Sequence, residues 1–268
     1  MLEYGIPVTF TVLAWWFLTG AILWLDRLPT RTFRYSMLGA TVVLGAALYA
    51  LIDTRARTTP MGSYVAFTAA LLIWGWIETS FLLGYVTGPR THGCPASCRG
   101  WRHFVHAIEA ILYHEIAIMV AAGAIALLTF GAPNRFALWT FLSLWLLRES
   151  AKLNLFLGVP NVGDRLLPDH LAYLGSFFRR RSMNALLPFS LTGATLLTVL
   201  AAGRAVDDAA TAGASLGWTL LATLLGLATL EHWFMVVPLP SEALWRLSMR
   251  TPPSKPSLPP ERVPCPPL

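Results

Sequence analysis

Residues 101–119, WRHFVHAIEAILYHEIAIM, decide the fold of this chain. The stretch is apolar enough to cross a lipid bilayer as a helix, yet it contains His106, Glu109, His114 and Glu115. Ionisable side chains at membrane depth are costly and tend to be functional. The stretch therefore predicts a membrane protein whose functional site lies within the bilayer.

The composition of the whole chain supports this prediction. Of its 268 residues, 55% are hydrophobic and 13% are charged, and the mean hydropathy is +0.57. A soluble domain carries roughly 25% charged residues, so an ordinary soluble protein is excluded. The net charge of +6 does not indicate a nucleic-acid partner, because basic residues of membrane proteins gather in cytoplasmic loops, beside the membrane lipid.

Apolar runs of about 20 residues predict an all-α fold, a polytopic integral membrane bundle of about seven transmembrane helices. The predicted helices are residues 4–25, 35–52, 64–86, 104–130, 136–157, 184–202 and 216–237. A further amphipathic helix is expected at the membrane interface, over about residues 168–181. Its apolar side consists of Leu171, Leu174, Phe177 and Phe178.

The basic residues predict how the bundle is oriented. The loops after the first, third and fifth helices, together with the tail, contain 14 Lys and Arg, whereas the other loops contain 4. By the positive-inside rule, the N-terminus lies outside and the C-terminus is cytoplasmic. Residues 1–240 are expected to form the membrane domain, and the Pro-rich residues 241–268 a disordered cytoplasmic tail.

Four predicted helices place ionisable residues at one depth, about 8 to 15 Å from their cytoplasmic ends at 1.5 Å per residue. These residues are Glu78, Glu109, His114, Glu115, Glu149, Glu231 and His232, beside the cations Arg148 and Lys152. Five glutamates thus face two fixed cations. Because uncompensated buried charge is not tolerated, protonation, charged histidines, water or a bound cation must balance the layer.

Three roles remain open for these residues. One is a network that fixes helix packing, since Arg148 and Lys152 are four residues apart on one helix face and each can pair with a glutamate. Another is a di-metal (iron) centre, because carboxylates and histidines on a helix bundle hold iron in this way. The candidate metal ligands are Glu78, His114, Glu115, Glu231 and His232. The third is a tetrapyrrole or proton site. The cofactor-binding candidates are His106, His170 and Lys152.

The loop before residue 104 contains His92-x-Cys94-x3-Cys98-x4-His103. Cysteine with histidine suggests zinc, but this spacing matches no standard structural site, and we expect an ordinary loop with reduced thiols. The chain has no Walker motif and no G-x-S-x-G sequence. No complete catalytic motif is therefore present, and an enzymatic role is the less favoured expectation.

Several stretches of the chain are similar to one protein family. They are MLEYGIPV (1–8), TFRYSMLGAT (32–41), WGWIETSFLLGYVTGPR (74–90), ILYHE (111–115), AKLNLFLGVPN (151–161), LPDHLAYLGSFFRRR (167–181) and LEHWFMVVPLP (230–240). Through them, residues 1–247 resemble the PuhE family, also called photosynthetic complex assembly protein 2 or DUF3623. Most of the candidate ligands lie inside these stretches, whereas Glu109 and Glu149 lie at positions where we expect the family to vary.

The resemblance implies a multi-pass protein of the inner membrane of a purple-type phototrophic bacterium. It implies a role in assembling the photosynthetic reaction centre and its light-harvesting antenna, including bacteriochlorophyll supply. Reaction-centre and light-harvesting subunits or other assembly factors are the implied partners. The resemblance supplies no catalytic mechanism. An assembly factor is therefore one hypothesis, and a membrane-embedded, metal-dependent, di-iron-like oxidoreductase acting on a pigment or lipid-soluble substrate is the other.

Overall fold

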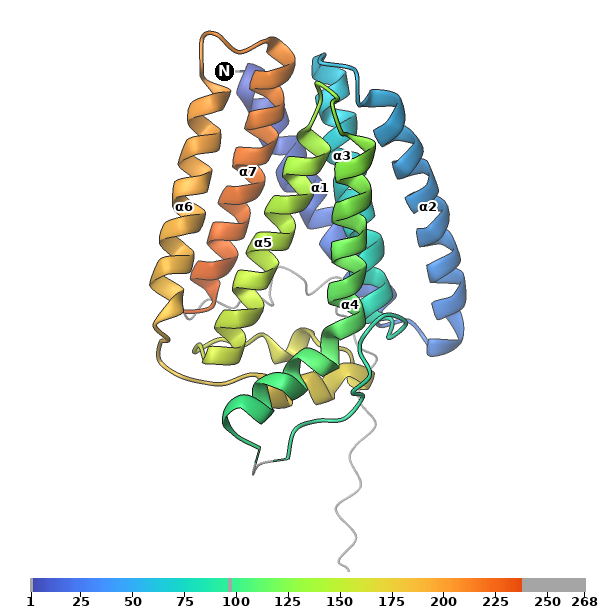
Figure 1. Ribbon diagram of the computed structural model, residues 1–268, viewed down its shortest axis with the longest axis vertical. Coiled ribbons are helices and arrows are strands. Elements are labelled where there is room, and N and C mark those ends of the chain that lie inside the picture. Colours follow the sequence, from blue (N-terminus) through green and yellow to red (C-terminus); the bar gives the residue numbers. More distant parts are fainter. Residues whose placement is uncertain (1, 96–97, 238–268) are drawn as a thin grey trace, which may run out of the picture.

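The chain folds into an all-α bundle, shown in Figure 1 as a computed structural model. The structure describes residues 2–95 and 98–237. The long helices of this part are α1 (Leu2–Leu25), α2 (Phe33–Thr54), α3 (Pro60–Leu82), α4 (Gly100–Leu128), α5 (Phe136–Leu157), α6 (Leu186–Ala205) and α7 (Ala212–Phe234). Three short 3₁₀ helices join them: η1 (Thr30–Thr32), η2 (Asp164–Leu166) and η3 (Asp169–Phe177). The predicted fold class is confirmed, and the predicted tail lies outside the described residues.

Six of these helices are long and apolar enough to cross a membrane, which makes the chain a multi-pass membrane protein. The exception is α5, whose second half carries Arg148, Glu149 and Lys152. In Figure 1 this helix nevertheless runs beside the others, between α4 and α7. It contacts α3, α4, α6 and α7, so its charged residues have neighbouring helices to pair with.

The central element of the bundle is α3, which contacts α1, α2, α4, α5 and α7. Its residues Ala66, Ala69 and Ala70 are buried, and so are Ile73 and Ile77. The small side chains of the three alanines let neighbouring helix backbones approach closely within a membrane. A charged residue on α3 is consequently surrounded by protein on most sides, and Glu78 is such a residue.

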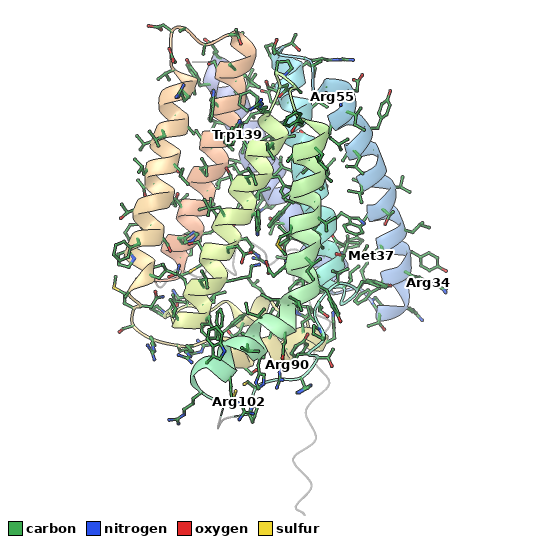
Figure 2. All side chains as sticks on the ribbon, viewed as in Figure 1. Arg34, Met37, Arg55, Arg90, Arg102 and Trp139 are labelled. Atoms are coloured by element: carbon green, nitrogen blue, oxygen red, sulfur yellow. The ribbon has the colours of Figure 1, made fainter. Side chains whose placement is uncertain are left out.

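The two ends of the bundle differ in charge, as the sequence predicts. The connections α1–α2, α3–α4 and α5–α6 lie together at the lower end in Figure 1, and the other three lie at the upper end. Figure 2 shows Arg34, Arg90 and Arg102 near the lower end and Arg55 near the upper end. The lower end is the one that the positive-inside rule assigns to the cytoplasm.

The helix boundaries lie within four residues of the prediction, and two of the larger differences have local reasons. Helix α3 ends at Leu82 and not at residue 86, because Gly84 adopts a φ of +83° and reverses the chain. This left-handed conformation is open to glycine at little cost. Helix α7 begins four residues earlier than predicted, at Ala212, because the Thr211 side chain accepts a hydrogen bond from the backbone N–H of Ala214.

The predicted interfacial helix is shorter than expected and is the 3₁₀ helix η3. Its Leu171, Leu174 and Phe177 recur at every third residue, which is the period of a 3₁₀ helix. All three are buried in a cluster with Phe81 of α3. The apolar side of η3 therefore packs against the protein and not into lipid, and Phe178 packs in a separate cluster.

Candidate functional site

Polar side chains from several helices gather in the lower half of the bundle, where most are buried or half-buried and Arg148 and Glu231 are exposed. We call this set the polar layer and define it as Glu78 (α3), His114 and Glu115 (α4), Arg148, Glu149, Ser150 and Lys152 (α5), and Glu231 and His232 (α7). Helix α5 supplies both cations. Because Arg148 and Lys152 are one helical turn apart, they lie on one face of α5 and reach different partners.

Glu78 joins three helices. Its carboxylate accepts a hydrogen bond from Arg148 at 3.0 Å, and its other oxygen, Oε1, lies 3.9 Å from His114 Nε2. His114 is 2% exposed, and its ring lies against Phe81, with 4.4 Å between the centroids. A separation of 3.9 Å is longer than a hydrogen bond, so the contact between the two groups is electrostatic. Helices α3, α4 and α5 are thus tied together at one buried carboxylate.

Lys152 forms the second centre of the layer. Its Nζ contacts Glu149 on its own helix at 2.6 Å and also pairs with Glu115 of α4. The prediction that each cation of α5 takes a glutamate is therefore confirmed. Glu109 does not join the layer, because it pairs with Arg90 at 3.6 Å. Four glutamates remain for two cations, so the layer is less acidic than the sequence suggests.

Helix α7 completes the layer through hydrogen bonds. His232 is 2% exposed, and its Nδ1 donates to the carbonyl oxygen of Ala228 at 2.8 Å. Its Nε2 lies 3.0 Å from the Ser150 hydroxyl, which is then the donor. Both ring nitrogens of His232 are occupied in this way. Glu231 instead accepts from the Trp15 indole of α1 at 3.1 Å.

The five candidate metal ligands are divided among these contacts. In the part of the chain that the structure describes, Glu78, His114, Glu115, Glu231 and His232 do not form a group of three or more with their ligand atoms within 4.8 Å of one another. Glu115 is held by Lys152, and His232 has no free nitrogen. The contacts favour a network that fixes helix packing, which is one of the roles that the sequence leaves open.

The three cofactor-binding candidates lie in three different places. Lys152 belongs to the polar layer. His170 of η3 donates from Nε2 to the carbonyl oxygen of Leu82 at 2.8 Å, at the end of α3. His106 of α4 faces the loop before that helix, where its Nδ1 lies 3.5 Å from Cys94 and 3.3 Å from Cys98. These residues therefore do not line one common pocket.

The grouping of Cys94, Cys98 and His106 differs from the ordinary loop that the sequence predicts. In the sequence this group has the spacing Cys94-x3-Cys98-x7-His106. The spacing considered above as a zinc motif ends at His103 instead. The ring of His103 instead stacks on Phe156. Partial burial and the neighbouring Cys98 thiol raise the pKa of the Cys94 thiol. By itself this thiol is consequently a weak nucleophile.

The comparisons with known proteins identify the family of the chain. Residues 1–255 match the family described as "Protein of unknown function (DUF3623)". A protein of Rhodobacter capsulatus, described as an uncharacterized 30.4 kDa protein in the puhA 5′ region, is 42% identical to the chain over 239 residues. This alignment covers 88% of the chain and 87% of the relative. No solved structure matches. The chain therefore belongs to the DUF3623 family.

Proposed function

We propose that this DUF3623 protein is an inner-membrane assembly factor for the bacterial photosynthetic reaction centre and its light-harvesting complex. The observation that carries the proposal is the 42% identical relative, whose description places it in the puhA 5′ region, a photosynthesis gene region. Because the alignment covers most of both chains, we expect the two proteins to share one role. Bacteriochlorophyll supply, which the family resemblance implies, is the finer form of the same proposal.

The contacts of the polar layer support a structural role over a catalytic one. Arg148 and Lys152 are held by carboxylates of α3, α4 and α5. Polar contacts between helices are a means of fixing helix packing where water is absent. A di-metal centre would need its ligands free to converge on one ion, whereas Glu115 is paired with Lys152 and both ring nitrogens of His232 are hydrogen-bonded. An assembly factor needs a fixed framework, and the layer provides one.

The surroundings of α2 are those expected for a protein that works within the bilayer. This helix lies at the edge of the bundle, packed on α3 (Figure 1). Its outward face exposes Tyr35, Leu38, Val42 and Tyr49, each by more than 60%. A stripe of large apolar side chains on an outer helix belongs in lipid or against a transmembrane helix of another protein.

Co-purification tests the proposal. A phototrophic bacterium would be grown under photosynthetic conditions with an affinity-tagged copy of the chain, and its membranes solubilised in a mild detergent. We expect reaction-centre or light-harvesting polypeptides to be enriched over a tagged, unrelated multi-pass protein of the same membrane and similar abundance. Extraction of the purified sample and its absorption spectrum would report bound bacteriochlorophyll. Recovery of no photosynthetic polypeptide from cells that contain them would contradict the proposal.

A further inference from the structure

Two thiols and an imidazole converge at the lower end of the bundle, outside the polar layer. Cys94 Sγ and Cys98 Sγ lie 3.5 Å and 3.3 Å from the same nitrogen, Nδ1 of His106. All three atoms lie within 4.8 Å of one another, the only such group of three or more His, Cys, Asp or Glu ligands among residues 2–95 and 98–237. An imidazole nitrogen has one lone pair or one proton, so it cannot hydrogen-bond both sulfurs well.

We propose that Cys94, Cys98 and His106 bind a soft divalent metal ion, with zinc as the expected ion. This site is independent of the proposed function, because it rests only on the geometry of these side chains. With three protein ligands, a tetrahedral ion keeps a fourth position for water or another donor. Thiolate with imidazole selects zinc over magnesium or calcium, which prefer oxygen ligands.

The distances agree with a zinc site. Zinc lies about 2.3 Å from a thiolate sulfur and about 2.0 to 2.1 Å from an imidazole nitrogen. At a tetrahedral angle, these bond lengths separate the sulfur from the nitrogen by about 3.6 Å. The two observed separations of 3.5 and 3.3 Å are within a few tenths of an ångström of this value. An ion can therefore be placed between the three atoms with small side-chain adjustments.

The loop that carries Cys94 is fixed against the helix that carries His106. The backbone N–H of Cys94 donates to Ser176 Oγ of η3 at 2.9 Å. Earlier in the loop, Arg90 pairs with Glu109 of α4. Gly88 lies so close to the Glu109 backbone that a Cβ at this position would overlap the carbonyl oxygen. A metal ion is bound more tightly when its ligands are already held in place, and these contacts hold the loop of Cys94 in place.

The charge of the site also suits a divalent metal ion. A metal binds the thiolate form of cysteine and displaces the thiol proton. Two thiolates and a divalent ion sum to no net charge, so the centre can lie at the membrane surface without a further counter-ion.

Metal analysis of the full-length protein, purified in a mild detergent, tests the site. With zinc supplied during growth, we expect about one zinc per chain by mass spectrometry, falling to background in Cys94→Ser, Cys98→Ser and His106→Ala. The matched control is Cys265→Ser, because Cys265 lies beyond the family match at residues 1–255. This variant should keep its zinc. His114→Ala, in the polar layer, should keep it as well.

Cobalt(II) provides a second readout, and its first measurement uses the wild-type protein and so does not depend on how well a variant folds. In the zinc-free wild-type protein, added cobalt should give the charge-transfer absorption of thiolate ligands, and Cys94→Ser should weaken it while the protein still elutes as a single species. The proposal is overturned if the wild-type protein binds neither ion. It is also overturned if zinc persists in the double variant Cys94→Ser/His106→Ala, or if His114→Ala alone removes it.

Discussion

Removing Lys152 is the sharpest test of the polar layer, because one ammonium group holds two carboxylates there. In Lys152→Met, Glu115 and Glu149 keep their positions but lose the cation between them. The Lys152 side chain is 21% exposed and that of Glu115 is 16% exposed. Breaking a buried ion pair by removing one partner costs about 3 to 5 kcal/mol. Partial exposure places this case at the lower end, so we expect a loss of about 3 kcal/mol in the free energy of unfolding.

A double-mutant cycle separates this ion pair from other effects of the substitution. Unfolding would be followed by circular dichroism in mixed micelles for the wild type, Lys152→Met, Glu115→Gln and the double variant. Because Glu115→Gln removes one unpaired charge, the double variant should be more stable than the sum of the single variants predicts, by about 1 to 2 kcal/mol. Arg204→Met, at an exposed position of α6, serves as the control and should change stability by less than about 0.5 kcal/mol. Additive effects within about 0.5 kcal/mol would refute the pairing.

Three further substitutions test other contacts by the same unfolding measurement. Asp26 is buried, and burial raises its pKa from 3.8 to about 7. Because the folded protein then holds this proton more tightly than the unfolded chain, the free energy of unfolding should fall as the pH rises from about 4 through 7. The total loss should be at most about 4 kcal/mol. Asp26→Asn should flatten this dependence, and an unchanged pH profile would contradict the assignment. Gly88→Ala should cost about 1 to 3 kcal/mol by pushing the loop from α4, whereas Gly123→Ala, with open space around it, should not destabilise. Ser150→Ala should cost about 1 to 3 kcal/mol by leaving His232 Nε2 without a donor, and equal stability would argue against that hydrogen bond.

The helices were predictable from sequence because their apolar runs have the length that a bilayer requires. Even α5, which is more polar than the six helices that qualify as membrane spans, was predicted with its observed bounds, residues 136–157. The boundaries were less accessible, because single residues decide them. The φ of Gly84 ends α3 early, and the Thr211 cap starts α7 early.

The polar layer was partly predictable because helical spacing places residues on faces and at depths. The pairing of Arg148 and Lys152 with glutamates follows from their four-residue separation. Which glutamate pairs with each cation depends on how the helices pack, and the spacing of residues along the chain carries no information about that packing. Glu109 illustrates this point, because the folding of the α3–α4 loop against α4 brings Arg90 to it and removes it from the layer.

The group of Cys94, Cys98 and His106 was not predicted because the two cysteines lie in a loop, and residue spacing does not predict the conformation of a loop. Sequence motifs for zinc rely on common spacings, and Cys94-x3-Cys98-x7-His106 is not among them. The helical register of α4 turns His106, and not His103, toward the two thiols. Such a choice between two histidines one turn apart becomes visible only once the start of the helix is placed at Gly100.

Deleting the gene from a phototrophic bacterium tests the proposed function most directly. The measurement is the amount of assembled reaction-centre and light-harvesting complex per cell, read from the absorption spectrum of isolated membranes. The account predicts that the deletion strain assembles markedly less of these complexes and that the wild-type chain, supplied on a plasmid, restores them. Equal amounts of both complexes in the parent and the deletion strain would contradict a role in their assembly.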